Sequence, residues 1–297
     1  METREAPVPL KYSGPNAEQI KYWNEASGPK WVAWHDLVDA QIRPLGLQAM
    51  ERARIVTGER VLDVGSGCGA TTLELARRVG PTGSATGVDI SGVMLQRARE
   101  AAAQAKLSNV RFENADAQTH AFEPESMDAI FSRFGVMFFA QPDAAFANLR
   151  NALRPGGRLA FVAWQAVHLN PWMFVPVAAA AQHITIPLPT SPDAPGPFAF
   201  ADVERVRGIL SRAGFADVGF EELTDTVSVA GGADLDQTVD FLLQMGPTGN
   251  AIRDAGAGAD ALTAVTAAIR EALQPYVTSD GVRMQAAAWI VTGRRPD

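Results

Sequence analysis

The sequence has few of the residues that build disulfide bonds or metal sites. Cys68 is the only cysteine in 297 residues, so no disulfide can form within the chain. Such cysteine usage suits a reducing compartment, and we expect a cytoplasmic location. Four histidines, one cysteine and the lack of an H-x-x-x-H spacing offer no set of zinc ligands, so we predict no metal site.

Long apolar runs and blocks of like charge are missing as well. The longest apolar run, 172–181, has ten residues and contains Pro176, whereas a membrane span needs roughly 20. Residues 1–11 carry charges and two prolines in place of the apolar centre of a signal peptide. The net charge is −7, and no five consecutive residues share a charge that could follow a phosphate backbone. We therefore expect neither a membrane span nor a nucleic acid partner.

The chain has an ordinary globular composition, 47 % hydrophobic and 20 % charged. From Arg60 onwards, short β-branched runs alternate with helical spacings, a pattern that predicts an α/β fold with parallel strands joined by helices. The expected strands are 60–64, 84–90, 110–114, 127–131, 157–164, a strand near 218–229 and 285–292. The expected helices are 16–26, 30–57, 92–106, 142–153, 202–213 and two between 234 and 274.

The remaining segments suggest additions to this core. Residues 1–57 are predicted to form a helical segment over the active site, with helix 30–57 kinked or divided at Pro44. Residues 58–230 and 281–297 form the predicted core. Within it, 166–199 is a proline-rich insertion, and its seven prolines between 171 and 197 predict an irregular course. Residues 231–280 are predicted to be a helical cap inserted before the last strand, because a hairpin needs far fewer residues.

A glycine-rich loop carries the main chemical signal. The predicted buried strand 60–64 runs directly into Gly65, Gly67 and Gly69, and a helix begins near Ala70. Glycines allow a tight turn and a close approach to a ligand, and the helix N-terminus offers free N–H groups. This arrangement suits a nucleotide-like ligand.

Two carboxylates are expected at the same edge of the sheet. Asp89 ends the second strand, 24 residues after Gly65, at a position where an acid can bind both hydroxyls of a ribose. Asp116 follows the third strand. Since the carboxyl ends of parallel strands converge, the loop and both acids should share one crevice.

With these blocks, the chain resembles the class I S-adenosylmethionine-dependent methyltransferases, in particular the small-molecule branch that includes quinone-biosynthesis enzymes. Four blocks stand in family order: Val61–Gly69, Gly87–Ser91, Ala115–Ala117, and the pair Asp128–Phe134 with Leu153–Leu159. The resemblance covers about 59–164 and implies a Rossmann-like, seven-stranded, mostly parallel sheet. The fourth strand ends in Ser132-Arg133-Phe134-Gly135, unlike the Asn/Asp-Pro-Pro-aromatic signature of enzymes that methylate adenine or glutamine amides.

The resemblance implies methyl transfer from S-adenosylmethionine to a small, largely hydrophobic acceptor, with S-adenosylhomocysteine as product. Asp63 would lie near the cofactor's amino group, Asp89 on the ribose hydroxyls and Asp116 on the adenine amino group. The expected cofactor-binding residues are Asp63, Gly65, Ser66, Gly67, Asp89, Ile90, Asp116, Ala117 and Ser132. The expected substrate wall consists of Trp34, Phe134, Phe138, Trp164, Trp172, Phe241 and Met245.

Alternatives remain for individual residues and for the function. Asp63 equally suits a structural role on the glycine loop, and Arg133 either binds a substrate anion or forms an ion pair. Trp23, Trp31 and Trp34 either pack in the core or form a lid over the cofactor or substrate. His35 and His168 are the candidate bases, because each is placed where it can meet the pocket.

Two other functions share part of the pattern. Gly65, Gly67 and Ala70 also satisfy the dinucleotide fingerprint of an NAD(P)-dependent oxidoreductase. Against this reading stand Asp63, Asp116 and the lack of a Tyr-x-x-x-Lys motif. A non-catalytic S-adenosylmethionine-binding module would use the same glycines and acids. The sequence predicts no particular oligomeric state.

Overall fold

A computed structural model describes residues 10–186, 191 and 193–297, so most of the N-terminal 1–11 segment and part of the predicted 166–199 insertion lie outside the described residues. The strands are β1 (Arg60–Val64), β2 (Ser84–Asp89), β3 (Val110–Asn114), β4 (Met127–Arg133), β5 (Leu153–Trp164), β6 (Ala216–Ser228), β7 (Val277–Thr278) and β8 (Gly281–Arg294). The helices are α1 (Ala17–Lys21), α2 (Gly28–Ala33), α3 (His35–Ala53), α4 (Ala70–Val79), α5 (Gly92–Ala105), α6 (Pro142–Ala152), α7 (Pro171–Ala180), α8 (Val203–Arg212), α9 (Leu235–Gln244), α10 (Gly246–Asp254) and α11 (Ala259–Leu273).

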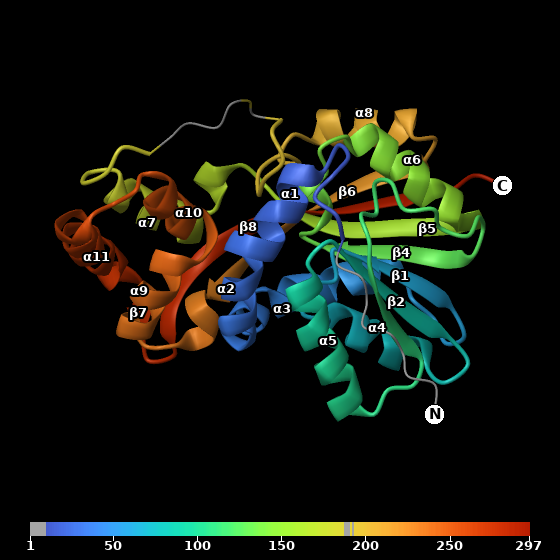
Figure 1. Ribbon diagram of the computed structural model, residues 1–297, viewed down its shortest axis with the longest axis horizontal. Helices are drawn as coiled ribbons and strands as arrows, with labels where there is room; N and C mark the ends of the chain where they lie inside the picture. Colours follow the sequence, from blue (N-terminus) through green and yellow to red (C-terminus); the bar gives the residue numbers. More distant parts are fainter. Residues whose placement is uncertain (1–9, 187–190, 192) are drawn as a thin grey trace.

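The core of the molecule is one sheet with the strand order β3-β2-β1-β4-β5-β8-β6, and the short β7 pairs with β8 alone. The five strands from β3 to β5 are parallel, whereas β8 is antiparallel to both of its neighbours. Helices α3, α4 and α5 cover one face, and α6 and α8 cover the other (Figure 1). The predicted α/β fold is therefore confirmed, with β7 as an unpredicted extra strand.

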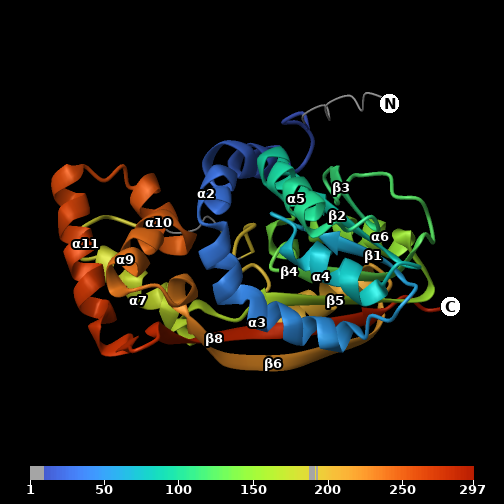
Figure 2. The same cartoon turned by 90° about the horizontal axis from the view of Figure 1, so that it is seen from below.

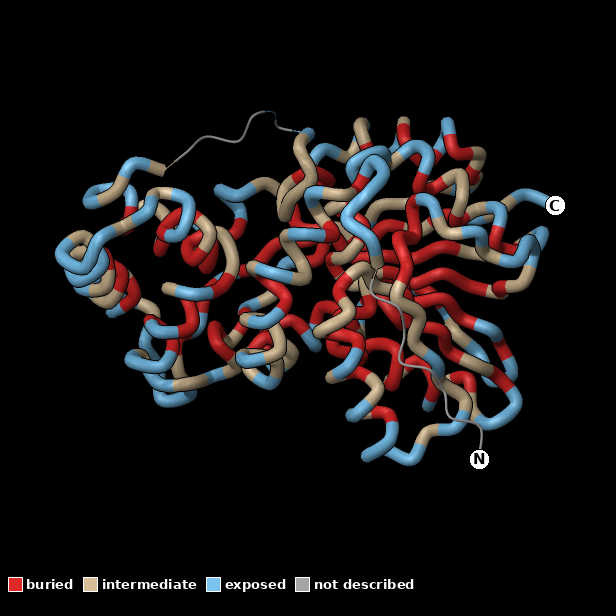
Figure 3. The backbone as a smooth tube through the Cα atoms, in the orientation of Figure 1, coloured by how far each residue is buried: buried red, intermediate tan, exposed pale blue. Residues whose placement is uncertain are grey.

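The buried segments follow the central strands and the inward faces of the helices (Figure 3). β1 is buried from Val61 to Val64, as expected for a parallel strand covered on both faces.

Side-chain caps mark where two of the helices begin. The Ser91 side chain accepts from Met94 N at the start of α5, and Asp202 accepts from Glu204 N and Arg205 N at the start of α8.

A second lobe is built from α7, α9, α10 and α11, at the end of the molecule away from β1 and β2 (Figure 1). β6 and β8, with 13 and 14 residues, run from the main sheet to this lobe (Figure 2). Because α7 packs against α10 and α11, the lobe combines residues from the predicted insertion and from the predicted cap.

Three local predictions are wrong. The predicted division at Pro44 is wrong, because Pro44 lies inside α3 and the break falls at Trp34 instead, whereas the alternative of a kink at Pro44 stays a prediction. The stretch 171–180 is the regular helix α7, with Pro171 in its first turn and Pro176 inside it, although an irregular course was expected. The stretch 234–274 holds three helices, because the Gly246-Pro247 sequence that was expected to end a helix begins α10.

The structure also bears on the membrane prediction. Among the described residues, no helix combines the length and the apolar character that crossing a membrane requires.

Candidate active site

A cavity opens at the carboxyl ends of the parallel strands, between the main sheet, the N-terminal helices and the second lobe. Its wall includes Gly65, Ser66, Gly67, Asp89, Ile90, Asp116 and Ala117 from the strand ends and loops of the sheet. α3 contributes His35, Val38, Asp39 and Ile42, and the second lobe contributes Trp172, Met173, Phe241, Leu242, Met245 and Thr248. The structure thus brings most of the predicted site residues to one hollow.

The glycine loop after β1 has a backbone conformation that favours glycine. Gly65, Gly67 and Gly69 all have positive φ angles, of 69°, 55° and 87°. A Cβ on Gly65 would also lie 2.7 Å from the Cα of Gly135, so the loop packs directly on the segment after β4. The loop then leads into α4, whose first N–H groups face the same end of the sheet.

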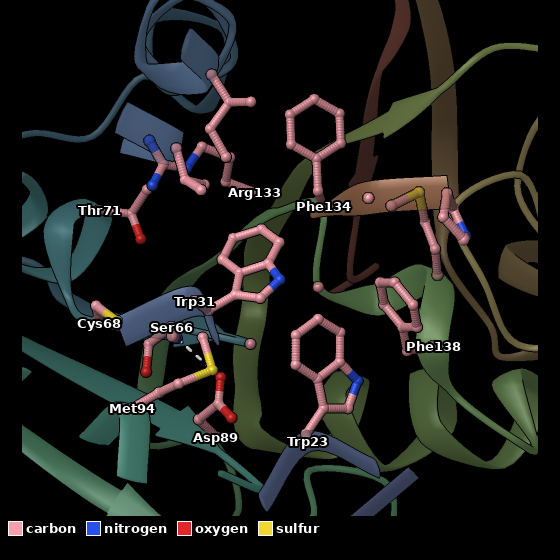
Figure 4. Close-up of a pocket in the computed structure, with 18 of the residues that line it drawn as sticks. Trp23, Trp31, Ser66, Cys68, Thr71, Asp89, Met94, Arg133, Phe134 and Phe138 are labelled. Carbon is pink, nitrogen blue, oxygen red and sulfur yellow. Dashed lines mark hydrogen bonds between the residues drawn. The ribbon is translucent and has the colours of Figure 1, made fainter. Parts of the chain in front are cut away.

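Asp89 ends β2 and holds the glycine loop. Its carboxylate accepts hydrogen bonds from Gly67 N and Ser91 N, both at 2.8 Å. Burial raises the pKa of Asp89, although these backbone donors act in the opposite direction. The carboxylate therefore fixes the loop while remaining part of the cavity wall (Figure 4).

Asp116, after β3, is contacted from the N-terminal segment. Asn16 Nδ2 donates to Asp116 Oδ1 at 3.0 Å, and Gln118 N donates to the same oxygen at 3.0 Å. Asn16 Oδ1 in turn accepts from Ala140 N at 3.0 Å. Because Asn16 also lines the cavity, the N-terminal segment contributes directly to its wall.

Two residues predicted to bind the cofactor are absent from the cavity wall. Asp63 is fully buried beneath the loop, where Oδ2 accepts from the hydroxyls of Thr71 and Thr72 at 2.6 Å each. Burial raises the pKa of Asp63 to about 6. Ser132 Oγ donates to Val64 O at 2.7 Å and accepts from Gly135 N at 3.2 Å, so it joins β4 to β1.

Aromatic side chains form much of the remaining wall. Phe134, directly after β4, has a positive φ of 59°, a costly conformation for a bulky residue. Its ring stacks on Trp164, with centroids 3.9 Å apart and planes 11° from parallel, and Trp172 meets Trp164 edge-on at 5.3 Å. The predicted substrate residues Phe134, Phe138, Trp164, Trp172, Phe241 and Met245 all line the cavity.

The N-terminal tryptophans divide into two groups. Trp23 and Trp31 line the cavity, and Trp23 packs edge-on against Phe138 at 5.1 Å (Figure 4). Trp34, predicted to bind substrate, lies behind the wall, where its ring packs edge-on against Phe241 at 5.8 Å.

The two candidate bases also differ in position. His35 lines the cavity, and burial lowers its pKa below the ordinary 6.5, which keeps the imidazole neutral at pH 7. His168 is exposed in the turn Val167–Leu169 and is not part of the cavity wall. Cys68 lines the cavity as a thiol, because burial raises its pKa to about 12.

Sequence reasoning missed several polar residues of the wall, among them Asn16 and Asp39. Asp39 Oδ1 lies 2.8 Å from Arg133 Nη2, and both side chains are mostly buried. Asp39 is four residues after His35, so helical spacing within the predicted helix 30–57 was the available signal. No comparable signal marked Asn16, because its partner Asp116 is 100 residues away.

Part of the chain is similar in sequence to known methyltransferases. Residues 61–157 match a family model described as a methyltransferase domain. Over 118 residues the chain is 36 % identical to aklanonic acid methyltransferase DauC of Streptomyces sp. (strain C5), covering 40 % of this chain and 54 % of that protein. Over 154 residues it is 33 % identical to ubiquinone/menaquinone biosynthesis C-methyltransferase UbiE of Methylococcus capsulatus, covering 51 % and 62 %. The chain thus spans little more than half the length of these relatives.

Solved structures share the fold. The YcgJ protein of Bacillus subtilis superposes with a TM-score of 0.54 at 18 % identity, covering 85 % of this chain and 98 % of that one. Phosphoethanolamine N-methyltransferase 2 of Haemonchus contortus, solved with S-adenosyl-L-methionine, superposes with a TM-score of 0.53 at 21 % identity, covering 86 % and 53 %. Residues 61–157 are therefore similar to a methyltransferase domain, and the chain shares its fold with these solved structures.

Proposed function

We propose that this chain transfers the methyl group of S-adenosylmethionine to a small, largely hydrophobic acceptor by in-line displacement. The observation that carries the proposal is a single cavity in which the glycine loop, Asp89 and Asp116 face an aromatic wall. A cofactor at the strand ends and an acceptor against the aromatic wall would meet within this one space. The relatives are named for acting on aklanonic acid and in quinone biosynthesis, which supports a small-molecule acceptor.

The chain's own residues would supply binding and alignment. Asp89 would accept from the ribose hydroxyls and Asp116 from the adenine amino group, while Ile90 and Ala117, which line the cavity, would border the adenine. Gly65, Ser66 and Gly67 would face the methionine part. Ser66 Oγ is buried and has no hydrogen-bond partner among the described residues, so a bound ligand can satisfy it.

S-adenosylmethionine, when bound, supplies an already activated sulfonium methyl group. Holding the acceptor atom in line with it can lower the barrier by about 7 to 11 kcal/mol in favourable cases. The thiol of Cys68, with its raised pKa, would take no part as a nucleophile. Where the acceptor must lose a proton, His35 would accept it, because its neutral imidazole lies in the cavity wall.

The N-terminal helices and the second lobe would act as the cover of the acceptor space. In this proposal, residues 1–57 and 231–280 are additions to the core, as predicted. The cap also includes α7, which packs against α10 and α11. Such a covered, apolar pocket favours a small acceptor over a protein or nucleic acid chain. A cytoplasmic location stays part of the proposal and rests on the single cysteine.

Two measurements test the proposed function. Calorimetric titration with S-adenosylmethionine, S-adenosylhomocysteine and NAD should show binding of the first two alone. Methyl-labelled S-adenosylmethionine incubated with a metabolite extract should then label an organic-soluble product. NAD binding would favour an oxidoreductase, and S-adenosylmethionine binding without transfer to any extract would favour a non-catalytic binding module.

A further inference from the structure

The charged residues of the cavity wall are unevenly distributed. In the part of the chain that the structure describes, three carboxylates line the cavity, Asp39, Asp89 and Asp116, and Arg133 is the only lysine or arginine that does so. Asp89 ends β2 and Asp116 follows β3, whereas Asp39 and Arg133 meet between α3 and the end of β4. The wall thus contains an ion pair apart from the two acids assigned to the nucleoside.

This pair is a close ion contact, and Asp39 Oδ1 accepts no hydrogen bond among the described residues. Arg133 Nη2 lies 2.8 Å from Asp39 Oδ1, and Arg43 Nη1 approaches Asp39 Oδ2 from outside at 3.6 Å. α3 crosses Arg133 so closely that a Cβ on Gly46 would lie 2.5 Å from its Cδ. Across residues 10–186, 191 and 193–297, the Arg133 guanidinium makes no other ion pair or hydrogen bond, so most of its five N–H donors are free for a ligand.

Asp63, which the resemblance assigned to the cofactor's amino group, does not line the cavity, although its Oδ1 has no hydrogen-bond partner among the described residues. Asp63 is fully buried, and its Oδ2 already accepts from two threonine hydroxyls. The methionine end of the cofactor carries an ammonium and a carboxylate, and burying either charge without a partner is costly. With Asp89 and Asp116 assigned to the nucleoside, Asp39 and Arg133 are the acid and the cation that remain on the described cavity wall for these charges.

We infer that the Asp39–Arg133 pair binds the zwitterionic amino acid end of the cofactor, with Arg133 on the carboxylate and Asp39 on the ammonium. The view into the cavity agrees with this assignment: Arg133 and Thr71 lie at one end of the wall, Asp89 and Met94 at the other, and Ser66 and Cys68 between them (Figure 4). An adenosine at Asp89 would thus direct its amino acid tail towards Arg133. Phe134 and Phe138 lie beside this line, where an acceptor would bind (Figure 4).

The inference rests on the proposed cofactor site. It adds that this site selects ligands that carry the amino acid end over ligands that carry the nucleoside alone. A ligand with the nucleoside but without the amino acid end would forgo both charged contacts. Wild-type protein should therefore bind S-adenosylhomocysteine at least about tenfold more tightly than 5′-methylthioadenosine, since charge-assisted hydrogen bonds are strong. Of the two charges at the amino acid end, decarboxylated S-adenosylmethionine keeps only the ammonium. Its binding therefore reports the contribution of Asp39 without that of Arg133.

The test compares calorimetric affinities of single variants for these ligands. Arg133→Gln should weaken S-adenosylhomocysteine binding by about 10- to 100-fold while changing that of 5′-methylthioadenosine by less than about twofold. Asp39→Asn should weaken both S-adenosylhomocysteine and decarboxylated S-adenosylmethionine. Arg43→Gln is the matched control, because Arg43 touches Asp39 from outside the cavity, and it should leave all affinities within about twofold.

Breaking one partner of a buried pair can also unfold a protein, so the neutral double variant Asp39→Asn/Arg133→Gln accompanies the single ones. It should retain 5′-methylthioadenosine binding and lose the preference for S-adenosylhomocysteine. Equal losses for both ligands in every variant, or wild-type protein that binds them equally, would overturn the inference. Tight binding without methyl transfer would instead overturn the proposed function and leave this inference intact.

Discussion

Asn16 and Asp116 are 100 residues apart in the chain, yet their side chains form a 3.0 Å hydrogen bond in the cavity wall. Asn16 is almost fully buried, and its other amide atom accepts from Ala140 N. One asparagine therefore joins the start of the N-terminal helices to the acid assigned to adenine and to the segment before α6. This side chain therefore links the N-terminal segment to the strand-end side of the cavity.

Replacing Asn16 tests this link. Asn16→Ala removes two buried hydrogen bonds and should lower the free energy of unfolding by about 1 to 3 kcal/mol. Asn16→Asp should cost more at pH 7, because two carboxylates would then face each other, and the two variants should converge near pH 4 as one carboxylate takes a proton. Urea unfolding at both pH values measures the difference. Equal stabilities of the two variants at pH 7 would mean that Asn16 and Asp116 are separated in solution.

The parallel core was predictable because its signals are local. Strand 60–64 and strand 110–114 coincide with β1 and β3, since each is a short run bounded by turn residues. The convergence of Gly65, Asp89 and Asp116 followed from topology alone, because all three come after parallel strands of one sheet.

The errors arose where tertiary packing overrides local preference. Pro44 stays inside α3 because that helix buries Val38, Ile42 and Leu45 in the core, which outweighs the lost hydrogen bond. α7 likewise tolerates Pro176, since its buried face packs against α10 and α11. The start of α10 reads as a turn, but Pro247 suits a first helical turn.

The polar part of the site was harder to predict than its glycines. Asn16 and Asp39 belong to segments outside the matched domain, and their partners Asp116 and Arg133 are about 100 residues away. Only the folded chain shows these pairs. Asp63 lies behind the cavity wall for a more local reason, because the hydroxyls of Thr71 and Thr72 hold its carboxylate beneath the glycine loop.

Asp89 should be the most sensitive cofactor residue. Asp89→Ala removes the acceptor for the ribose hydroxyls and also frees Gly67 N, so cofactor binding should weaken by about 1.5 to 3 kcal/mol. Asp89→Asn keeps one acceptor oxygen and should lose less. Calorimetry with S-adenosylhomocysteine measures both, with Asp36→Asn as an exposed control on α3. Unchanged affinity of the alanine variant would remove Asp89 from the site.

His35 and His168 form a matched pair for testing proton transfer, because only His35 lines the cavity. For an acceptor that must lose a proton, His35→Asn should lower kcat by about 10²- to 10⁴-fold and leave cofactor affinity within about twofold. His168→Asn should behave as wild type. In wild-type protein, kcat should fall as the pH drops through the pKa of His35, which burial lowers below 6.5, and the His35→Asn profile should lack this step. The same step in both profiles would exclude His35 as the base.

Asp63 should make the protein less stable as the pH rises. Burial raises its pKa to about 6, although the hydroxyls of Thr71 and Thr72 and the charge of Arg133 act in the opposite direction. In the unfolded chain the carboxyl titrates near 3.8, so between about pH 4 and pH 6 the folded state binds more protons, and stability falls with rising pH. Above pH 6 the buried charge costs about 3 kcal/mol. The comparison of Asp63→Asn with wild type in urea unfolding at pH 4.5 and 7.5 isolates this contribution, because the amide stays neutral and still accepts from both threonines. The wild type should lose more stability than the variant between the two pH values, and parallel losses would show that Asp63 titrates at its ordinary pKa.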